Sequence, residues 1–250
     1  KFIWVDAQLE NFMYKQKEII GKLTLYLADA TKMLPQIEQH QCIFYDPPFD
    51  IWGKFDAIKA NQMIAFCSPT SRHTVEKILG KPRSEIVWHF ADGRWVSKKL
   101  PRITHDYIYI YGETSTANVG ERQKTTGSNK GNSSIGKDKL GKRFYKPKER
   151  KHLNSVQIFP RNMSNPLGSW GKPTVLVKRL IEWVNPANVL DPFMGSGTTL
   201  EACVQLGIKA TGIEISQKNF DIACSRLEKT EMQKELFIYD QPSLFIDRDV

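Results

Sequence analysis

The sequence lacks the features that mark membrane, secreted and metal-dependent proteins. No apolar run approaches the roughly 20 residues that a transmembrane helix needs, and residues 1–10 show neither the apolar run nor the cleavage site of a signal peptide. Five histidines are scattered without the spacing of metal ligands. Cysteines are few and form no C-x-x-C pair; each lies in an apolar or helical-looking stretch, at Cys42, Cys67, Cys203 and Cys224. We therefore predict no membrane segment, no metal, and small buried thiols in a reducing compartment.

Acidic residues are scarce in one segment. From Glu121 to Lys151, eleven Lys or Arg face three Asp or Glu, a balance of +8 in a chain whose net charge is +9. The surrounding stretch 114–151 is rich in Gly, Ser, Thr, Asn and Lys and poor in apolar residues, so it cannot bury enough surface to fold alone. We interpret it as a mobile or partner-ordered insert that contacts a polyanion. A solvated linker would show the same run of charge.

The rest of the chain alternates between strand and helix patterns. Buried strands are expected at 23–29, 42–46, 61–69, 188–191 and 209–215. Helical patterns occupy 30–39, 70–80, 173–184, 198–207 and 216–229. Two stretches, 84–95 and 105–113, are typical of antiparallel strands late in a sheet. The sequence therefore predicts an α/β fold with a Rossmann-like, doubly wound mixed sheet, mostly parallel with a late antiparallel strand.

A glycine-rich loop joins a strand to a helix in "NVLDPFMGSGTTLEA" (188–202). Gly195 and Gly197 allow a ligand to approach the backbone closely, and the start of the helix offers free N–H groups to a phosphate or carboxylate. Glu214 ends the next strand, where an acid suits ribose hydroxyls. The loop follows neither the G-x-G-x-x-G nor the P-loop pattern. It predicts a nucleoside ligand with a short anionic tail; a purely structural turn is the alternative.

A second candidate loop is "DPPF" (46–49). Pro47 and Pro48 have no backbone N–H, so the loop is stiff and offers acceptors only. The Asp46 side chain and a nearby proline carbonyl can accept both hydrogens of an –NH₂ group, which localises the nitrogen lone pair. Phe49 offers a face on which a base can stack. Asp-Pro also occurs in ordinary turns, but both loops follow the carboxyl ends of predicted parallel strands, where such folds bind ligands.

With both loops, the sequence resembles the amino-directed DNA methyltransferases that use S-adenosylmethionine, in the circularly permuted group whose catalytic motif precedes the cofactor motif. The blocks that carry the resemblance are "LADATKMLPQIEQHQCIFYDPPF", "KPTVLVKRLIEWV", "NVLDPFMGSGTTLEACVQLG" and "GIEISQKNFDIACSRL". It implies a single methyltransferase domain made of a catalytic half and a cofactor-binding half, with a basic target-recognition insert between them and a C-terminal tail after them. The bounds expected for these four parts are 1–112, 155–229, 113–154 and 230–250.

The resemblance also implies roles for individual residues. The target base would be gripped by Asp46, Pro47, Pro48 and Phe49. The methionine end of the cofactor would be surrounded by Asp191, Phe193, Gly195, Ser196, Gly197 and Thr198. Glu214 would hold the ribose, Asp29 and Ala30 the adenine, and Lys172 the methionine carboxylate. Two departures stand out: position 49 is Phe where the family more often has Tyr, and "SWGKP" lacks the usual His-Pro-Thr opening of the block.

The implied activity is methyl transfer from S-adenosylmethionine to N6 of a flipped adenine in DNA. Asp46 favours adenine, because the family more often begins this motif with Ser for N4 of cytosine. RNA is a further possible substrate, and a non-catalytic nucleic-acid-binding subunit is the alternative from another class. The family implies a monomer or homodimer in the cytoplasm of a bacterial or phage-infected cell, with or without a partner restriction enzyme.

Two further stretches carry weaker hypotheses. The tail "DQPSLFID" (240–247) resembles the Gln-x-x-Leu-Phe peptide that bacterial replication proteins insert into the sliding clamp, through Gln241, Leu244 and Phe245. The alternative is a tail that docks on its own domain. In "KKLPRITHDYIYIYG" (98–112), Arg102 or His105 would contact DNA near the flipped base, unless the stretch is an ordinary tyrosine-rich strand.

Overall fold

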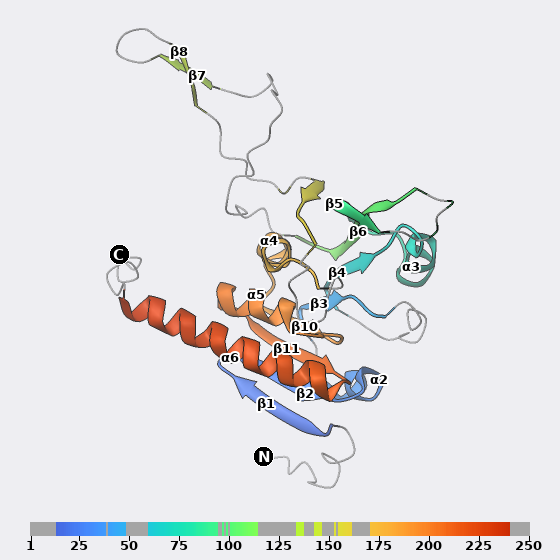
Figure 1. Ribbon diagram of the computed structural model, residues 1–250, viewed down its shortest axis with the longest axis vertical. Helices are drawn as coiled ribbons and strands as arrows, with labels where there is room; N and C mark the ends of the chain where they lie inside the picture. Colours follow the sequence, from blue (N-terminus) through green and yellow to red (C-terminus); the bar gives the residue numbers. More distant parts are fainter. Residues whose placement is uncertain are drawn as a thin grey trace.

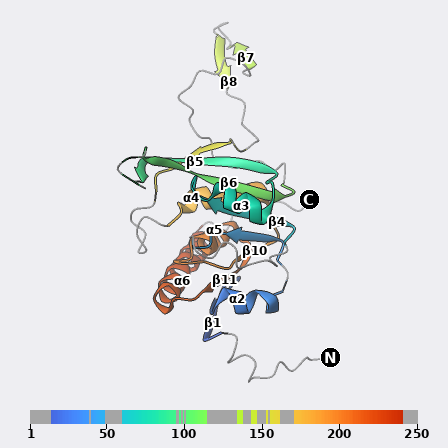
Figure 2. The same ribbon diagram turned by 90° about the vertical axis from the view of Figure 1, so that its right-hand side faces the viewer.

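A nine-stranded mixed sheet lies at the centre of the protein, with helices on both faces (Figures 1 and 2). This computed structural model describes residues 14–38, 40–48, 60–94, 97, 99, 101–114, 134–137, 143–146, 153, 155–161 and 171–240. Across the sheet the strands follow the order β1 (Gln16–Ile20), β2 (Leu23–Leu27), β11 (Lys209–Glu214), β10 (Asn188–Asp191), β3 (Cys42–Tyr45), β4 (Gln62–Cys67), β6 (Ile103–Gly112), β5 (Ser84–Arg94) and β9 (Val156–Ile158).

The five middle strands, from β2 to β4 in that order, are parallel to one another. At one side β1 adds an antiparallel strand; at the other, β6 runs antiparallel to both β4 and β5, and β9 runs parallel to β5. Every residue of β3 and β4 is buried, as expected for parallel strands covered on both faces. This arrangement confirms the predicted doubly wound mixed sheet with antiparallel strands at its late edge.

One face of the sheet is covered by α4 (Thr174–Val184), α5 (Thr198–Leu206) and α6 (Gln217–Asp240). Five apolar residues of α4 recur along one side of the helix and are at most 1% exposed: Leu176, Val177, Leu180, Ile181 and Val184. Burying each stabilises the fold by about 1.5–3 kcal/mol before ordering costs are counted. Pro173 caps the start of α4, and Asn185 ends the helix in the left-handed conformation, φ 51°.

The opposite face packs against the short α2 (Ala30–Met33), the 3₁₀ turn η1 (Leu34–Gln36) and α3 (Arg72–Leu79). Met33 from α2 and Val75 from α3 belong to the core cluster on this side. The sheet is therefore the middle layer of three. None of the helices in the described part of the chain combines the length and the hydropathy of a transmembrane segment.

Several elements differ from the expectation. Helix α6 continues to Asp240, beyond residue 229 where the sequence pattern places its end. Inside the predicted insert, β7 (Ser134–Lys137) and β8 (Arg143–Lys146) pair as an antiparallel two-stranded sheet, whereas its composition predicts no regular structure. Strands β1 and β9 have no predicted counterpart. In β9 the usual pattern is inverted, because Gln157 is buried while Val156 and Ile158 are exposed.

The chain leaves the middle of the sheet in two directions. From β10 it continues through α5 to β11 on one side, and from β3 it continues to β4 on the other. Sheets of this kind form a ligand crevice outside the carboxyl ends of the strands where the direction reverses. Because β3 and β10 are neighbours, the residues that follow them, Asp46 and the loop after Asp191, meet at this point.

Candidate active site

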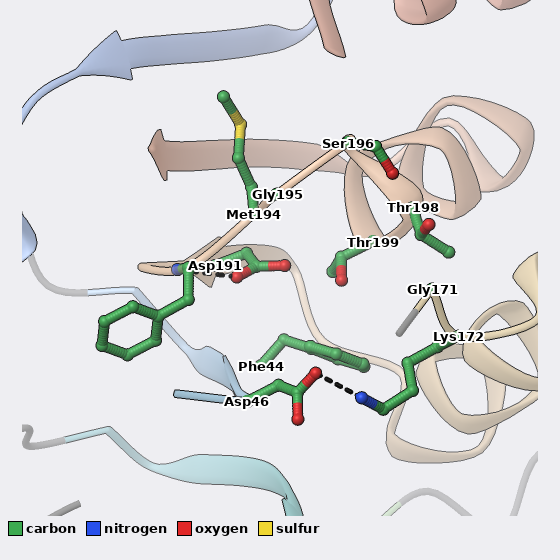
Figure 3. Close-up of a pocket in the computed structure, with 11 residues that line it drawn as sticks. Phe44, Asp46, Gly171, Lys172, Asp191, Met194, Gly195, Ser196, Thr198 and Thr199 are labelled. Carbon is green, nitrogen blue, oxygen red and sulfur yellow. Dashed lines mark hydrogen bonds and ion pairs between the residues drawn. The ribbon is translucent and has the colours of Figure 1, made fainter. Parts of the chain in front are cut away.

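A cavity of about 170 Å³ opens at the carboxyl ends of β3 and β10. Its walls come from three segments: the end of β3 with Asp46, the 171–172 segment before α4, and the glycine-rich loop with the first turn of α5. In Figure 3, Asp191 and Thr199 lie on one side of this space and Asp46 and Lys172 on the other. Two loops that are far apart in the sequence therefore share one cavity.

Glycines shape the loop between β10 and α5. Gly197 caps α5 with φ 81°, a conformation that L-residues rarely adopt, and its N–H donates to the Met194 carbonyl at 2.8 Å. A Cβ at Gly212, on the neighbouring β11, would lie 2.4 Å from the sulfur of Met194. The side chain of Met194 therefore packs over β11 at a position that has no side chain of its own, a role that the sequence analysis missed.

Asp191 is the most deeply buried acid of the cavity, with 3% of its surface exposed. Its Oδ1 accepts a hydrogen bond from the Phe193 N–H at 3.0 Å, and Thr199 also donates to its carboxylate. Burial, together with the negative charges of Asp46 and Glu214, outweighs these hydrogen bonds and raises the pKa of Asp191 to about 7. The site therefore contains a carboxyl group that a cationic ligand would help to ionise.

Glu214, at the end of β11, ties the glycine-rich loop to the sheet. One carboxylate oxygen accepts the Gly195 N–H at 3.0 Å and the other accepts the Ser216 N–H at 2.8 Å. A carboxylate has about four lone-pair sites, so each oxygen can accept another donor. The next residue, Ile215, is 69% exposed, which leaves an apolar side chain at the surface beside this acid. The sequence analysis did not single out Ile215.

Lys172 lines the side of the cavity opposite Asp191, next to Asp46. Its ammonium lies 2.5 Å from Oδ2 of Asp46 (Figure 3) and 5.1 Å from the ring centroid of Phe66, a residue of β4. Lys172 is 16% exposed and Asp46 33%. The lysine therefore forms a half-buried ion pair with the acid of the DPPF stretch.

Arg226 of α6 donates hydrogen bonds to the glycine-rich loop. The sequence analysis did not identify this residue. Nη1 donates to the backbone carbonyl and hydroxyl of Ser196 and to the Thr198 hydroxyl, at 3.1–3.4 Å. Nη2 donates to the Thr174 hydroxyl at 3.1 Å and pairs with Glu201. One guanidinium thus joins α4, α5, α6 and the loop.

The structure brings together seven of the predicted site residues on the cavity wall: Asp46, Lys172, Asp191, Phe193, Gly195, Ser196 and Thr198. Four further lining residues were not predicted, namely Phe44, Gly171, Met194 and Thr199. The sequence could have indicated these residues in part. Three of them adjoin a predicted site residue, and Phe44 belongs to the predicted strand that ends at Asp46.

Other predicted residues lie outside the lining. Asp29 caps α2, where its Oδ1 accepts the Thr31 N–H at 2.9 Å and the Thr31 hydroxyl at 2.7 Å, and Ala30 is buried in the same turn. This turn adjoins the end of β11, because the Ala28 N–H donates to the Glu214 carbonyl at 2.9 Å.

Of the DPPF stretch, Pro47 is buried and Pro48 exposed, whereas Phe49 lies outside the described residues. So do the tail residues Gln241, Leu244 and Phe245.

The cysteines are free thiols, as predicted, and Cys42, Cys67 and Cys203 are buried while Cys224 is half-buried. Burial raises the pKa of Cys42 and of Cys67 to about 12. These thiols are therefore protonated and inert at neutral pH. In the part of the chain that the structure describes, no cluster of His, Cys, Asp or Glu is arranged to hold a metal ion.

The strand order and the cavity at its switch point define a Rossmann-like α/β protein whose cavity is lined by a glycine-rich loop. The profile of a family described as DNA methylase, N6_N4_Mtase, matches residues 71–225, which is more than half of the chain. The protein belongs to this DNA methylase family.

Two curated relatives match over short stretches. The type II methyltransferase M.MjaII of Methanocaldococcus jannaschii is 52% identical over 46 residues, which are 18% of this chain and 9% of that protein. The type II methyltransferase M.ScaI of Streptomyces caespitosus is 41% identical over 58 residues, or 22% of this chain and 19% of that one. The chain thus aligns with less than a fifth of each relative's length.

Solved structures are similar over most of the chain. The complex of M1.HpyAVI with S-adenosylmethionine has a TM-score of 0.56 and 22% identity, and the likeness covers 82% of this chain and 98% of that one. TTHA0409 of Thermus thermophilus, also complexed with S-adenosylmethionine, has a TM-score of 0.56 and 18% identity over 82% and 93%. The cytosine-N4-specific PvuII DNA methyltransferase has a TM-score of 0.59 and 10% identity over 91% and 95%. These likenesses show the fold.

Proposed function

We propose that the protein transfers a methyl group from S-adenosylmethionine to the exocyclic amino group of a base in DNA, and that this group is N6 of a flipped adenine. The observation that carries the proposal is the shared cavity, in which Asp46 faces the glycine-rich loop of a DNA methylase family member. A methyl donor bound at the loop would present its sulfonium to a base held at Asp46.

The donor would be bound mainly by groups on the β10–β11 side. Ionised Asp191 would pair with its amino group, and the free N–H groups at the start of α5 would receive its carboxylate. A cavity of about 170 Å³ is smaller than the roughly 300–1,000 Å³ of most ligand pockets, so we assign only the methionine end of the donor to it. The nucleoside would extend along the strand ends, with the ribose at Glu214 and the adenine against Ile215 and the Asp29–Ala30 turn.

The chemistry needs positioning more than activation. The sulfonium methyl is already electrophilic, and binding both reactants side by side converts the reaction into an effectively intramolecular one. The amine nitrogen attacks the methyl carbon; an N–C bond forms, the C–S bond breaks, and its electron pair stays on sulfur as S-adenosylhomocysteine. The nitrogen then releases one proton to Asp46 or to water. Asp46 and a proline carbonyl orient the amine hydrogens, which localises the lone pair on nitrogen.

The experiment is incubation with S-adenosylmethionine labelled in its methyl group and PCR-amplified genomic DNA, which is unmethylated at every site. Mass spectrometry of the digested DNA identifies the modified nucleoside. Labelled N6-methyladenine is the expected product; labelled N4-methylcytosine would correct the base while keeping the reaction. Labelled RNA but unlabelled DNA would move the activity to the other nucleic acid. No transfer to any nucleic acid would favour a non-catalytic binding subunit.

We further propose that residues 113–154 are the target-recognition insert, between a catalytic half and a cofactor-binding half of one domain, and that the basic stretch from Glu121 to Lys151 within it contacts DNA. Its net +8 would make DNA binding strongly dependent on salt. Measuring DNA affinity at several salt concentrations, with and without charge-neutralising substitutions in this stretch, tests the assignment. The sliding-clamp contact through the tail stays a prediction.

A further inference from the structure

The contact between Lys172 and Asp46, on one side of the cavity, differs from what the family resemblance implies for the lysine. The family resemblance implies a lysine that binds the cofactor's carboxylate. In the structure, the ammonium of Lys172 instead lies 2.5 Å from Oδ2 of Asp46, the residue expected to accept the target amine. The charged end of Lys172 is therefore directed at the acceptor's site.

A second contact holds the ammonium of Lys172 on the β3–β4 side of the cavity. Nζ lies 5.1 Å from the ring centroid of Phe66, and such a cation–π contact is favourable when the cation is partly desolvated, as Lys172 is at 16% exposure. Phe66 belongs to β4 and Asp46 follows β3, so both partners stand on the side of the sheet away from β10 and β11. The backbone constrains the residue as well, because Pro173 follows it directly and caps α4.

The ion pair leaves Asp46 able to bind an amine. A carboxylate accepts about four hydrogen bonds, and Lys172 donates to Oδ2. In Figure 3 the other oxygen of Asp46 is directed away from the ammonium. A carboxylate that is one-third exposed and held by no donor would rotate about its terminal side-chain torsion, which has a broad energy profile. An ammonium on one oxygen fixes the direction of the other.

We infer that Lys172 is a positioning residue for the base rather than a ligand of the cofactor: it donates to Oδ2 of Asp46 and so aims Oδ1 at the hydrogen of the target amine. The inference rests on the proposed methyl transfer. It differs from the role implied by the family resemblance in a measurable way, because a positioning residue for Asp46 affects turnover, whereas a ligand of the methionine carboxylate affects cofactor affinity.

The test uses the full chain and the variants Lys172→Met, Lys172→Gln and Lys172→Arg. Lys209→Met serves as the matched control, because Lys209 is exposed at the start of β11, at the opposite end of that strand from the cavity. Calorimetry with S-adenosylhomocysteine measures cofactor affinity without DNA. Methyl transfer to PCR-amplified genomic DNA, at saturating donor and DNA, measures kcat. Thermal unfolding of each variant shows that it is folded.

We expect Lys172→Met to lower kcat by about 10–100-fold, the cost of misplacing a reacting group, while the Kd for S-adenosylhomocysteine changes by less than about threefold, because uniform cofactor binding is untouched. Lys172→Arg should recover most of kcat, since a guanidinium can also donate to Oδ2. Lys172→Gln, which is shorter and uncharged, should fall between Met and Arg. Lys209→Met should match the unmodified protein in both measurements.

Two results would overturn the inference. One is a rise of about tenfold or more in the Kd for S-adenosylhomocysteine in Lys172→Met, which would make the lysine a cofactor ligand. The other is an unchanged kcat in that variant. Failure of the proposed function looks different, because the unmodified protein would then transfer no methyl group to DNA, and the calorimetric arm would still decide which partner Lys172 serves.

Discussion

The two sides of the cavity are built differently. On the β10–β11 side, Asp191, Ser196, Thr198 and Glu214 are at most 8% exposed, and backbone N–H groups hold two of their carboxylates. On the β3–β4 side, Asp46 is 33% exposed and pairs with Lys172. The first side is buried and held by the backbone, as the proposed binding of an enclosed methyl donor requires. The second is open, as it must be if a base enters from outside.

The largest effect should come from Asp46→Asn, which acts on the open side alone. The variant keeps the shape of the side chain but removes the charge that orients and stabilises the amine. Methyl transfer should fall by about 10³-fold or more, while the affinity for S-adenosylhomocysteine stays within about threefold. Product assays and calorimetry check this. Loss of cofactor binding in Asp46→Asn would show that the two sides are not separate.

Asp191→Asn acts on the enclosed side. Without its carboxylate, the cofactor's amino group loses its partner, so we expect the Kd for S-adenosylhomocysteine to rise by about 10–100-fold, as for a charged hydrogen bond of roughly 1.5–3 kcal/mol. Calorimetry measures the affinity. A Kd that stays near that of the unmodified protein would contradict the assignment of Asp191.

The same substitution should stabilise the fold at high pH. The folded-state pKa of Asp191, about 7, is above the ordinary value of 3.8, so the folded state binds the proton more tightly between these values. In the unmodified protein, the contribution of the Asp191 carboxyl group to stability is therefore complete below pH 4 and is lost as the pH rises through 7. At pH 8, Asp191→Asn should therefore increase the free energy of unfolding by about 1–3 kcal/mol, and the gain should vanish near pH 4. Denaturant unfolding at both pH values decides, and equal gains would contradict the account.

Cofactor affinity should depend on pH through the same carboxyl group. Binding of a cationic amino group favours ionised Asp191, so below pH 7 the protein must release a proton when it binds the ligand. We expect affinity for S-adenosylhomocysteine to weaken by several-fold up to about tenfold per pH unit below 7 and to level off above it. In Asp191→Asn this dependence should be absent. A flat profile in the unmodified protein would show that Asp191 does not receive the ligand's charge.

Arg226→Lys should give the smallest effect. The variant keeps the positive charge but loses the planar guanidinium with its two donor nitrogens. In Arg226 one of these nitrogens donates to Ser196 and Thr198, and the other contacts Thr174 and Glu201. We expect the Kd for S-adenosylhomocysteine to rise by about three- to tenfold, with kcat at saturating donor nearly unchanged. A fall in kcat without a change in Kd would place Arg226 on the acceptor's side of the comparison.

Sequence patterns predict the two loops and their strands well, because each signal is local. Apolar runs such as 42–45 and 62–67 indicate strands buried on both faces, and Gly197 and Gly207 mark the two ends of α5. The alternation of strands and helices then places both loops at one edge of the sheet. Strand β9 could not be predicted from apolar residues in this way. Its buried residue is the polar Gln157, which accepts a hydrogen bond from Arg179 at 3.3 Å, and its apolar neighbours face outward.

Contacts between distant residues could not be predicted. The ion pair of Lys172 with Asp46 spans 126 residues, and Arg226 reaches partners 25 to 52 residues away. Gly212 is an ordinary strand residue in the sequence, and only the packing of Met194 over it explains why it has no side chain. The sequence therefore indicates which functional groups the site contains, whereas the structure shows which of these groups are in contact.

A crystal structure of the complex with S-adenosylhomocysteine tests the central claim most directly. The account predicts that the ligand's sulfur lies in the cavity between Asp46 and the loop of residues 193–197, with its amino group at Asp191 and its ribose at Glu214. A ligand bound elsewhere on the protein, or a sulfur turned away from Asp46, would contradict it.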